Sequence, residues 1–253
     1  MKNLWVLMLL CGACIAQTPL MDLGTGLYLN RYQGGLYPDG LNAMPANHYA
    51  DGLAAAAQVQ PVNGKIVLLA IGMSNITDEF CHQGSWKVGQ ACDAQSFIGK
   101  ASTDSAINSA VVPVDGAEGE QTAYYWTSNT MPGHNLKVNN YDRIRDSVLA
   151  PQGLTESQVQ VVYLKDADSY PSVRLPNSNA DAWTYEAYLG QIARTLKVRY
   201  PNLHQLFIST RIYAGYADPV TQNLNPEPYA YEYGFAAKWF IAAQITQIDK
   251  VHH

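Results

Sequence analysis

The sequence predicts a single three-layer α/β/α domain with a mainly parallel sheet. Short apolar runs of strand length alternate with longer segments of helical periodicity, and each apolar run ends in a polar or glycine-containing turn. Strands that alternate with helices return parallel to one another through right-handed crossovers, and helices then cover both faces of the sheet. A chain of 253 residues is long enough to bury one sizeable core of this kind.

The expected strands are apolar runs bounded by turn residues, at 66–71, 110–114, 159–164 and 206–209. Among the expected helices, the segment 182–200 has the clearest apolar stripe, and Pro201 ends it because proline cannot continue a helix. The other helices are expected at about 50–59, from 76 to 80, and at 102–108, 141–149 and 229–248.

The N-terminal residues 1–16 have the order of a secretory signal: a charged start, an apolar stretch and then small residues. Cleavage after Ala16 would export the chain, and modification of Cys14 would instead produce a lipoprotein. Residues 17–62 are rich in Gly, Pro, Asn and Tyr and are predicted to be a loop-rich covering arm, followed by the α/β/α domain over 63–253.

The charge pattern limits the class of partner. The formal net charge is −5 and no run of five basic residues occurs, so neither nucleic acid nor an anionic membrane surface is an expected partner. No segment of the mature chain is long and apolar enough to span a bilayer. We expect the substrate to be an ester of a small, neutral molecule or of a glycan. The sequence does not predict the oligomeric state.

Cys81 and Cys92 are the cysteines that remain after signal removal, and export favours a disulfide between them. Closing a loop of this size stabilises the fold by about 2 to 3 kcal/mol in the chain-entropy model. The paired Cys and His spacings of a zinc site are missing from the sequence. We therefore expect a structural disulfide, and neither a metal nor a cofactor.

Polar residues follow each of the four expected strands. They are Ser74 and Asn75, then residues 115–121, then 165–168, then 209–211. Because ligands of open α/β sheets bind outside the carboxyl ends of the strands, these groups are expected to meet at one rim. A serine at this place is a candidate nucleophile.

The block Gly72-Met73-Ser74-Asn75 resembles the first block of the SGNH (GDSL-type) hydrolases, in the Gly-x-Ser-Asn form found in carbohydrate O-acetylesterases. The resemblance implies a serine esterase, with Gly116 or Gly119 at the place of the oxyanion-hole glycine. The family's Gly-x-Asn-Asp block is absent, and Asp166-Ala167-Asp168 stands in its position.

The family normally has an Asp-x-x-His block in the loop before its last helix. Here that loop, Asn225 to Glu232, contains no histidine. A literal match occurs at Asp249 to His252, after that helix. The proton acceptor for Ser74 therefore has several candidates, of which His82 and Glu232 are preferred. The others are His48, His134, His204, which should lie at the opposite end of the sheet, and Glu227.

The resulting hypothesis makes Ser74 the nucleophile, Asn75 with Gly116 or Gly119 the oxyanion donors, and Asp168 and Arg211 substrate contacts. Each feature also has a structural interpretation. Ser74 can be a helix cap, the glycines can permit tight turns, and Arg211 can pair with Glu118 or Asp168. The rival functions are a catalytically silent protein that binds a glycan or a partner at the same rim, and a self-assembling surface protein.

Overall fold

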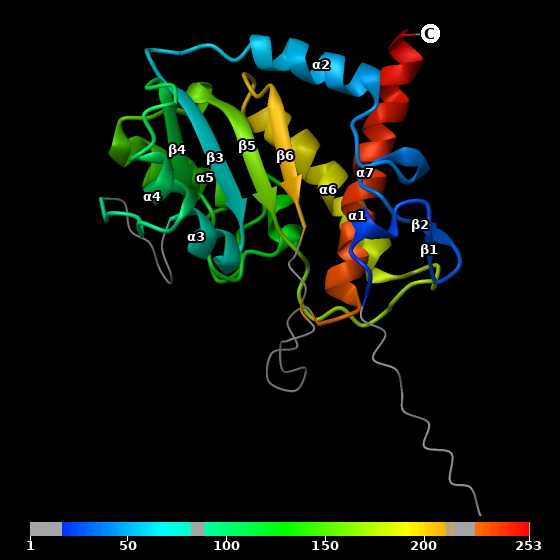
Figure 1. Ribbon diagram of the computed structural model, residues 1–253. Coiled ribbons are helices and arrows are strands. Elements are labelled where there is room, and N and C mark those ends of the chain that lie inside the picture. The colour runs from blue at the N-terminus through cyan, green and yellow to red at the C-terminus, as the bar shows by residue number, and fades with distance from the viewer. Residues whose placement is uncertain (1–16, 82–88, 211–213, 215–225, 253) are drawn as a thin grey trace, which may run out of the picture.

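The computed structural model describes residues 17–81, 89–210, 214 and 226–252. They form a parallel four-stranded sheet in the order β4-β3-β5-β6, with helices on both faces (Figure 1). This confirms the predicted three-layer α/β/α fold class. The strands, each within two residues of its predicted bounds, are β3 (Ile66–Gly72), β4 (Val111–Asp115), β5 (Val159–Lys165) and β6 (Gln205–Ser209).

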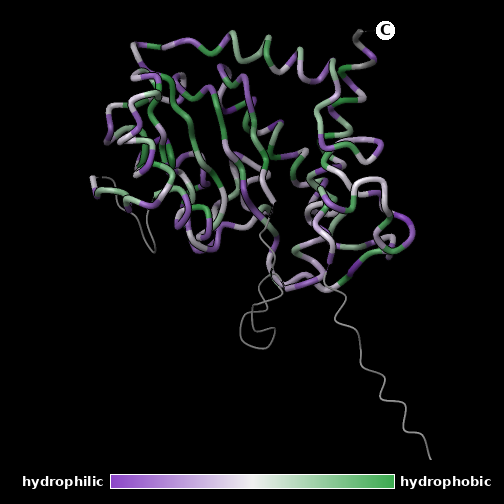
Figure 2. Tube along the Cα trace, viewed as in Figure 1, coloured by the Kyte–Doolittle hydropathy of each residue, from purple (hydrophilic) through white to green (hydrophobic). Residues whose placement is uncertain are grey.

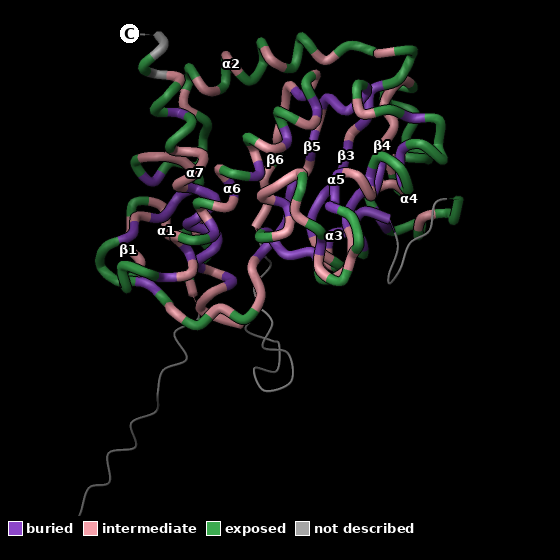
Figure 3. The backbone as a smooth tube through the Cα atoms, turned by 180° about the vertical axis from the view of Figure 1, so that it is seen from behind, coloured by how far each residue is buried: buried purple, intermediate pink, exposed green. Residues whose placement is uncertain are grey.

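The central strand β3 is apolar on both sides because helices cover both faces of the sheet (Figure 2). Val67, Leu69 and Ile71 enter the larger core, and Ala70 enters a smaller core with Ile76. In Figure 3 most residues of the central strands β3 and β5 are buried, whereas β6 has no buried residue. Helices packed on the larger core are α5 (Asn140–Arg143), its π-helical continuation η3 (Ile144–Leu149), α6 (Asp181–Arg199) and α7 (Tyr229–His252); those on the smaller core are α3 (Ser74–Phe80) and α4 (Phe97–Ala101).

Helix α6 shows why the periodicity predicted it correctly. Its buried residues Tyr185, Leu189, Ile192 and Leu196 recur at helical spacing and pack into the larger core. Asp181 stands in the first turn, and two basic residues stand in the last, which complements the helix dipole. The helix ends before Pro201, as predicted.

The helix predicted at 102–108 is wrong, because these residues form turns. Asp104 accepts a hydrogen bond from the Ala106 N–H, and Asn108 accepts one from the Ala110 N–H, both at 2.9 Å. Such local side-chain bonds compete with helical backbone bonds. The helix of this region is α4, which begins just after Ser96, whose hydroxyl caps the Gly99 N–H.

The segment 17–62 packs against α7. It contains α1 (Leu20–Leu23), the antiparallel pair β1 (Leu27–Tyr28) and β2 (Tyr32–Gln33), the turn η1 (Pro38–Gly40) and α2 (Ala46–Ala57). Tyr28 donates to Glu232, and Lys238 donates to the Gln33 and Gly34 carbonyls. Aromatic packing adds to the contact between this segment and α7, because the Tyr28 ring stacks on the ring of Phe235.

Helix α2 crosses the sheet at the amino ends of the strands (Figure 1). The Gly52 carbonyl accepts a hydrogen bond of 2.9 Å from Gln205, the first residue of β6. Gln60 and Gln160 exchange hydrogen bonds near the start of β5. The arm therefore braces the end of the sheet opposite the predicted rim.

The last helix is longer than predicted, and this corrects the expected place of the Asp249 to His252 match. These residues form the last turn of α7 and do not follow the helix. That end of α7 lies beside α2, away from the carboxyl ends of the strands (Figure 1). Among the described residues, no helix combines the length and apolar character that crossing a membrane requires.

Candidate functional site at the carboxyl ends of the strands

Ser74 is the first residue of α3, two positions after β3 ends at Gly72. Gly72 has φ 143°, and a Cβ there would stand 2.1 Å from the Lys165 carbonyl oxygen, so the turn requires glycine. The Ser74 side chain is exposed, and within the described part of the chain its hydroxyl makes no hydrogen bond. The helix cap is Met73, not Ser74. The serine is thus presented to solvent at the rim.

Asn75 has an unusual environment for an amide side chain. Its Nδ2 and Oδ1 atoms are both buried, and neither has a hydrogen-bond partner among the described residues. Leaving a buried polar group unpaired costs about 1 to 3 kcal/mol. Such groups are rare in native proteins, and a catalytic role is one of the explanations for them. Asn75 is therefore a prepared polar group directly beside Ser74.

The two candidate glycines after β4 differ in whether their backbone N–H is already hydrogen bonded. The Gly116 N–H donates to the Ala70 carbonyl at 2.9 Å, as a continuation of the sheet, so it is not available to an oxyanion. The Arg143 guanidinium donates a hydrogen bond of 2.6 Å to the Gly116 carbonyl. A Cβ on Gly119 would meet nothing within 4 Å, so this glycine borders open space. Of the two, Gly119 remains as a donor.

Backbone hydrogen bonds join the loops that follow three strands. The Glu118 N–H donates to the Gly72 carbonyl at 3.2 Å, and the Ala123 N–H donates to the Ala167 carbonyl at 3.0 Å. Lys165, paired in register with Gly72, reaches Glu79 on α3 in an ion pair. The polar groups after β3, β4 and β5 therefore lie at one rim, because the strands run parallel.

Two carboxylates at this rim have raised pKa values. Burial raises the pKa of Asp115, at the end of β4, to about 6. One Asp115 oxygen accepts from the Ala117 N–H, and the other is buried with no partner among the described residues. Burial also raises the pKa of Asp168, which accepts hydrogen bonds from the Ser169 N–H and the Thr122 side chain.

The described histidines lie at different ends of the sheet. His48 is on α2, at the amino ends of the strands, so it does not reach the rim. His204 also lies there, since its N–H donates to Gln160 near the start of β5, as predicted. His134 belongs to the loop after β4: its Nδ1 is 3.1 Å from the Tyr125 hydroxyl. His82 lies outside the described residues.

The two candidate carboxylate bases, Glu232 in the first turn of α7 and Glu227 just before that helix, already accept hydrogen bonds. The Glu232 oxygens accept hydrogen bonds from the Tyr28 hydroxyl and the Leu175 N–H, and the residue is 1% exposed. The Glu227 oxygens accept from the Ala214 and Tyr231 N–H groups. Glu232 thus joins the arm to α7, which provides a structural reason for its burial and leaves neither of its oxygens without a partner.

The predicted disulfide between Cys81 and Cys92 is confirmed, with a sequence separation of 11 residues. It begins at Cys81, the C-cap of α3, and the Asp93 N–H also donates to the Cys81 carbonyl at 2.8 Å. Arg211 lies outside the described residues. Arg143 was not predicted, since its contact with Gly116 spans 27 residues and leaves no local pattern.

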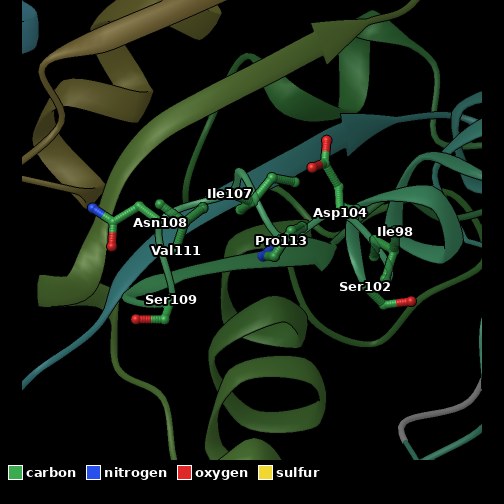
Figure 4. A pocket seen from close by; sticks show the side chains of 9 residues that line it. Ile98, Ser102, Asp104, Ile107, Asn108, Ser109, Val111 and Pro113 are labelled. Atoms are coloured by element: carbon green, nitrogen blue, oxygen red, sulfur yellow. The ribbon is translucent and has the colours of Figure 1, made fainter.

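A separate hollow of about 260 Å³ lies along the outer edge of β4 (Figure 4). Val111 and Pro113 line it from the strand, and Asp104 and Asn108 line it from the preceding turns. Both polar side chains are used in local turn hydrogen bonds. This hollow is therefore a poor candidate for the functional site.

Fold and rim together define an α/β/α protein with an exposed serine at the carboxyl edge of a parallel sheet. No protein-family model and no curated protein sequence matches the chain. A solved structure to which the chain is similar is a carbohydrate esterase family 2 enzyme plus carbohydrate-binding domain from Corynascus thermopiles (Myceliophthora fergusii). The identity is 12% and the TM-score 0.34, and the match covers 73% of this chain and 66% of that one.

Proposed function

We propose that this protein is an exported serine esterase that hydrolyses an acyl ester of a small neutral or carbohydrate substrate. The observation that carries the proposal is the pair Ser74 and Asn75: an exposed hydroxyl next to a buried amide that has no partner among the described residues. Acyl transfer needs a nucleophile with donors for the developing oxyanion beside it.

In the proposed reaction the Ser74 oxygen attacks the ester carbonyl carbon and its proton passes to a base. The Asn75 amide and the N–H groups of Ser74 and Gly119 stabilise the oxyanion. The carbon–oxygen bond of the ester breaks, and the alcohol leaves with the proton. Water then attacks the acyl-serine, which releases the acid and restores Ser74.

Two histidines are proposed as the base. His82 is close to Ser74 in the chain and directly follows Cys81, which the disulfide holds at the end of α3. His134 is the second candidate, because its loop after β4 contacts the turn that carries Ser74. Asp168 and Arg211 are proposed to contact the substrate at the same rim.

The experiment compares release of p-nitrophenol from p-nitrophenyl acetate by the wild type and by Ser74→Ala, His82→Ala and His134→Ala. We expect Ser74→Ala and one histidine variant to lose activity by a factor of roughly 10³ or more. Ser109→Ala, an exposed serine before β4, is the matched control and should retain wild-type activity. Background rates in the wild type would refute the esterase.

The alternative is a protein that binds a glycan or a partner at the rim without catalysis. It is favoured by one observation: no described basic group hydrogen bonds to the Ser74 hydroxyl. A fluorophosphonate probe separates the two, because it labels an activated serine. Peptide mass spectrometry that finds the label on Ser74 supports the esterase, and an unlabelled Ser74 in folded protein supports the binding protein.

A further inference from the structure

An aromatic cluster lies on the rim beside the candidate site. The short helix η2 (Ala123–Trp126) divides its side chains: Trp126 is fully buried and donates to the Gln121 carbonyl, while Tyr124 is 44% exposed. The Tyr124 ring is 5.9 Å from the ring of Tyr188, on α6, and 5.3 Å from the ring of Tyr125. Tyr124 thus presents an aromatic surface at the rim.

Carboxylates border this cluster. The Asp168 carboxylate lies near Tyr188, and the pKa of Tyr188 is raised by burial and by that charge. On the other side, the carboxylate of Glu120 lies 3.8 Å from the ring of His134, which in turn contacts Tyr125. The cluster therefore combines apolar ring faces with strong hydrogen-bond acceptors and a hydroxyl donor.

We infer that Tyr124 and Tyr188, with Asp168, form a subsite that binds the sugar rings of a neutral glycan. The apolar face of a sugar ring stacks on an aromatic face, and its hydroxyls donate to carboxylates. Nucleic acid bases also stack on tyrosine, but the phosphates that join them bind best beside cations, and the charged groups that border this cluster, Asp168 and Glu120, are carboxylates. The combination selects an uncharged, hydroxyl-rich ligand.

The position of the subsite connects it to the candidate nucleophile. Ala123, next to Tyr124, donates to Ala167 at the end of β5, and β5 pairs with β3 through Lys165 and Gly72. A glycan on this surface would extend along the strand ends towards the Ser74 turn. The inference rests on the proposed function, since it assigns the carbohydrate part of the ester substrate to these residues.

The experiment measures binding without turnover, by affinity electrophoresis in gels that contain xylan, hydroxyethylcellulose or galactomannan. We expect at least one polysaccharide to retard the wild type. Tyr124→Ala should weaken that affinity roughly tenfold. Asp168→Asn, which preserves shape, should weaken it as well. Tyr49→Ala is the matched control, because Tyr49 is 54% exposed on α2 at the other end of the sheet.

Two results overturn the inference: no retardation of the wild type in any gel, or a Tyr124→Ala variant retarded like the wild type. Circular dichroism confirms that each variant is folded. A protein that binds a polysaccharide and hydrolyses no ester refutes the proposed function alone. One that hydrolyses p-nitrophenyl acetate and is not retarded refutes this inference alone.

Discussion

The Glu118 N–H donates a hydrogen bond of 3.2 Å to the Gly72 carbonyl, which ties the loop after β4 to the turn that carries Ser74. The Ala123 N–H donates to the Ala167 carbonyl in the same way, so hydrogen bonds join the loops that follow β3, β4 and β5 at one rim. Positions far apart in sequence therefore lie at the same edge of the sheet.

Asn75→Ala should lower kcat for p-nitrophenyl acetate roughly 10²- to 10³-fold, as expected when an oxyanion donor is removed. Stability should not fall, since the amide makes no hydrogen bond to any described residue. Thr77→Val is the matched control: its hydroxyl is also buried without a described partner on α3, and the substitution should leave kcat unchanged. An Asn75→Ala protein that loses stability but keeps kcat would show a structural amide.

Gly72→Ala should destabilise the fold by more than about 3 kcal/mol, a loss typical of severe strain. The new Cβ would lie 2.1 Å from the Lys165 carbonyl, at a φ of 143° that side chains rarely adopt. Urea unfolding measures the change. Gly119→Ala, where a Cβ meets nothing within 4 Å, should unfold at nearly the wild-type urea concentration. Equal midpoints for both variants would contradict the geometry.

Asp115→Asn should be more stable than the wild type at pH 7.5. Burial raises the Asp115 pKa to about 6 in the folded state. The protonated carboxyl therefore contributes fully to stability at a pH below its pKa in the unfolded chain, and this contribution is lost as the pH rises through 6. The cost of ionisation at pH 7.5 is at most about 3 kcal/mol. Urea unfolding at pH 4 and pH 7.5 should show a gain only at the higher pH, and a gain of equal size at both would be the contrary result.

Removing the Cys81–Cys92 disulfide should cost about 2 to 3 kcal/mol by the chain-entropy model. The double variant Cys81→Ser, Cys92→Ser should therefore have a lower Tm than the oxidised wild type. Reductant should lower the Tm of the wild type and leave the variant unchanged. If reductant lowers the Tm of both proteins equally, the bridge is not the cause.

The strands were predictable because their apolar runs are local signals. Residues 66–71 and 159–164 lie within one residue of the observed β3 and β5. The segment 102–108 failed for a local reason of another kind, since Asp104 and Asn108 bind neighbouring backbone groups and favour turns. The disulfide was predicted from cysteine number and export, without geometry.

The site was only partly predictable. The position of Ser74 followed from the end of β3, but the amino acid sequence contains no sign that the Gly116 N–H is taken by Ala70 while Gly119 borders open space. Glu232 looked like a candidate base because it lies near the start of the last helix. Its partners, Tyr28 and Leu175, are 204 and 57 residues away.

Sequence alone determined the order of strands and helices, the parallel sheet and the serine at a strand end, because these depend on hydropathy period and on residues adjacent in the chain. Tertiary structure decided which groups are engaged and which are left without a partner. Whether Asn75 finds a hydrogen bond, or Asp115 keeps its proton, depends on burial and on neighbours brought together by folding. Those contacts join distant segments, and no local pattern records them.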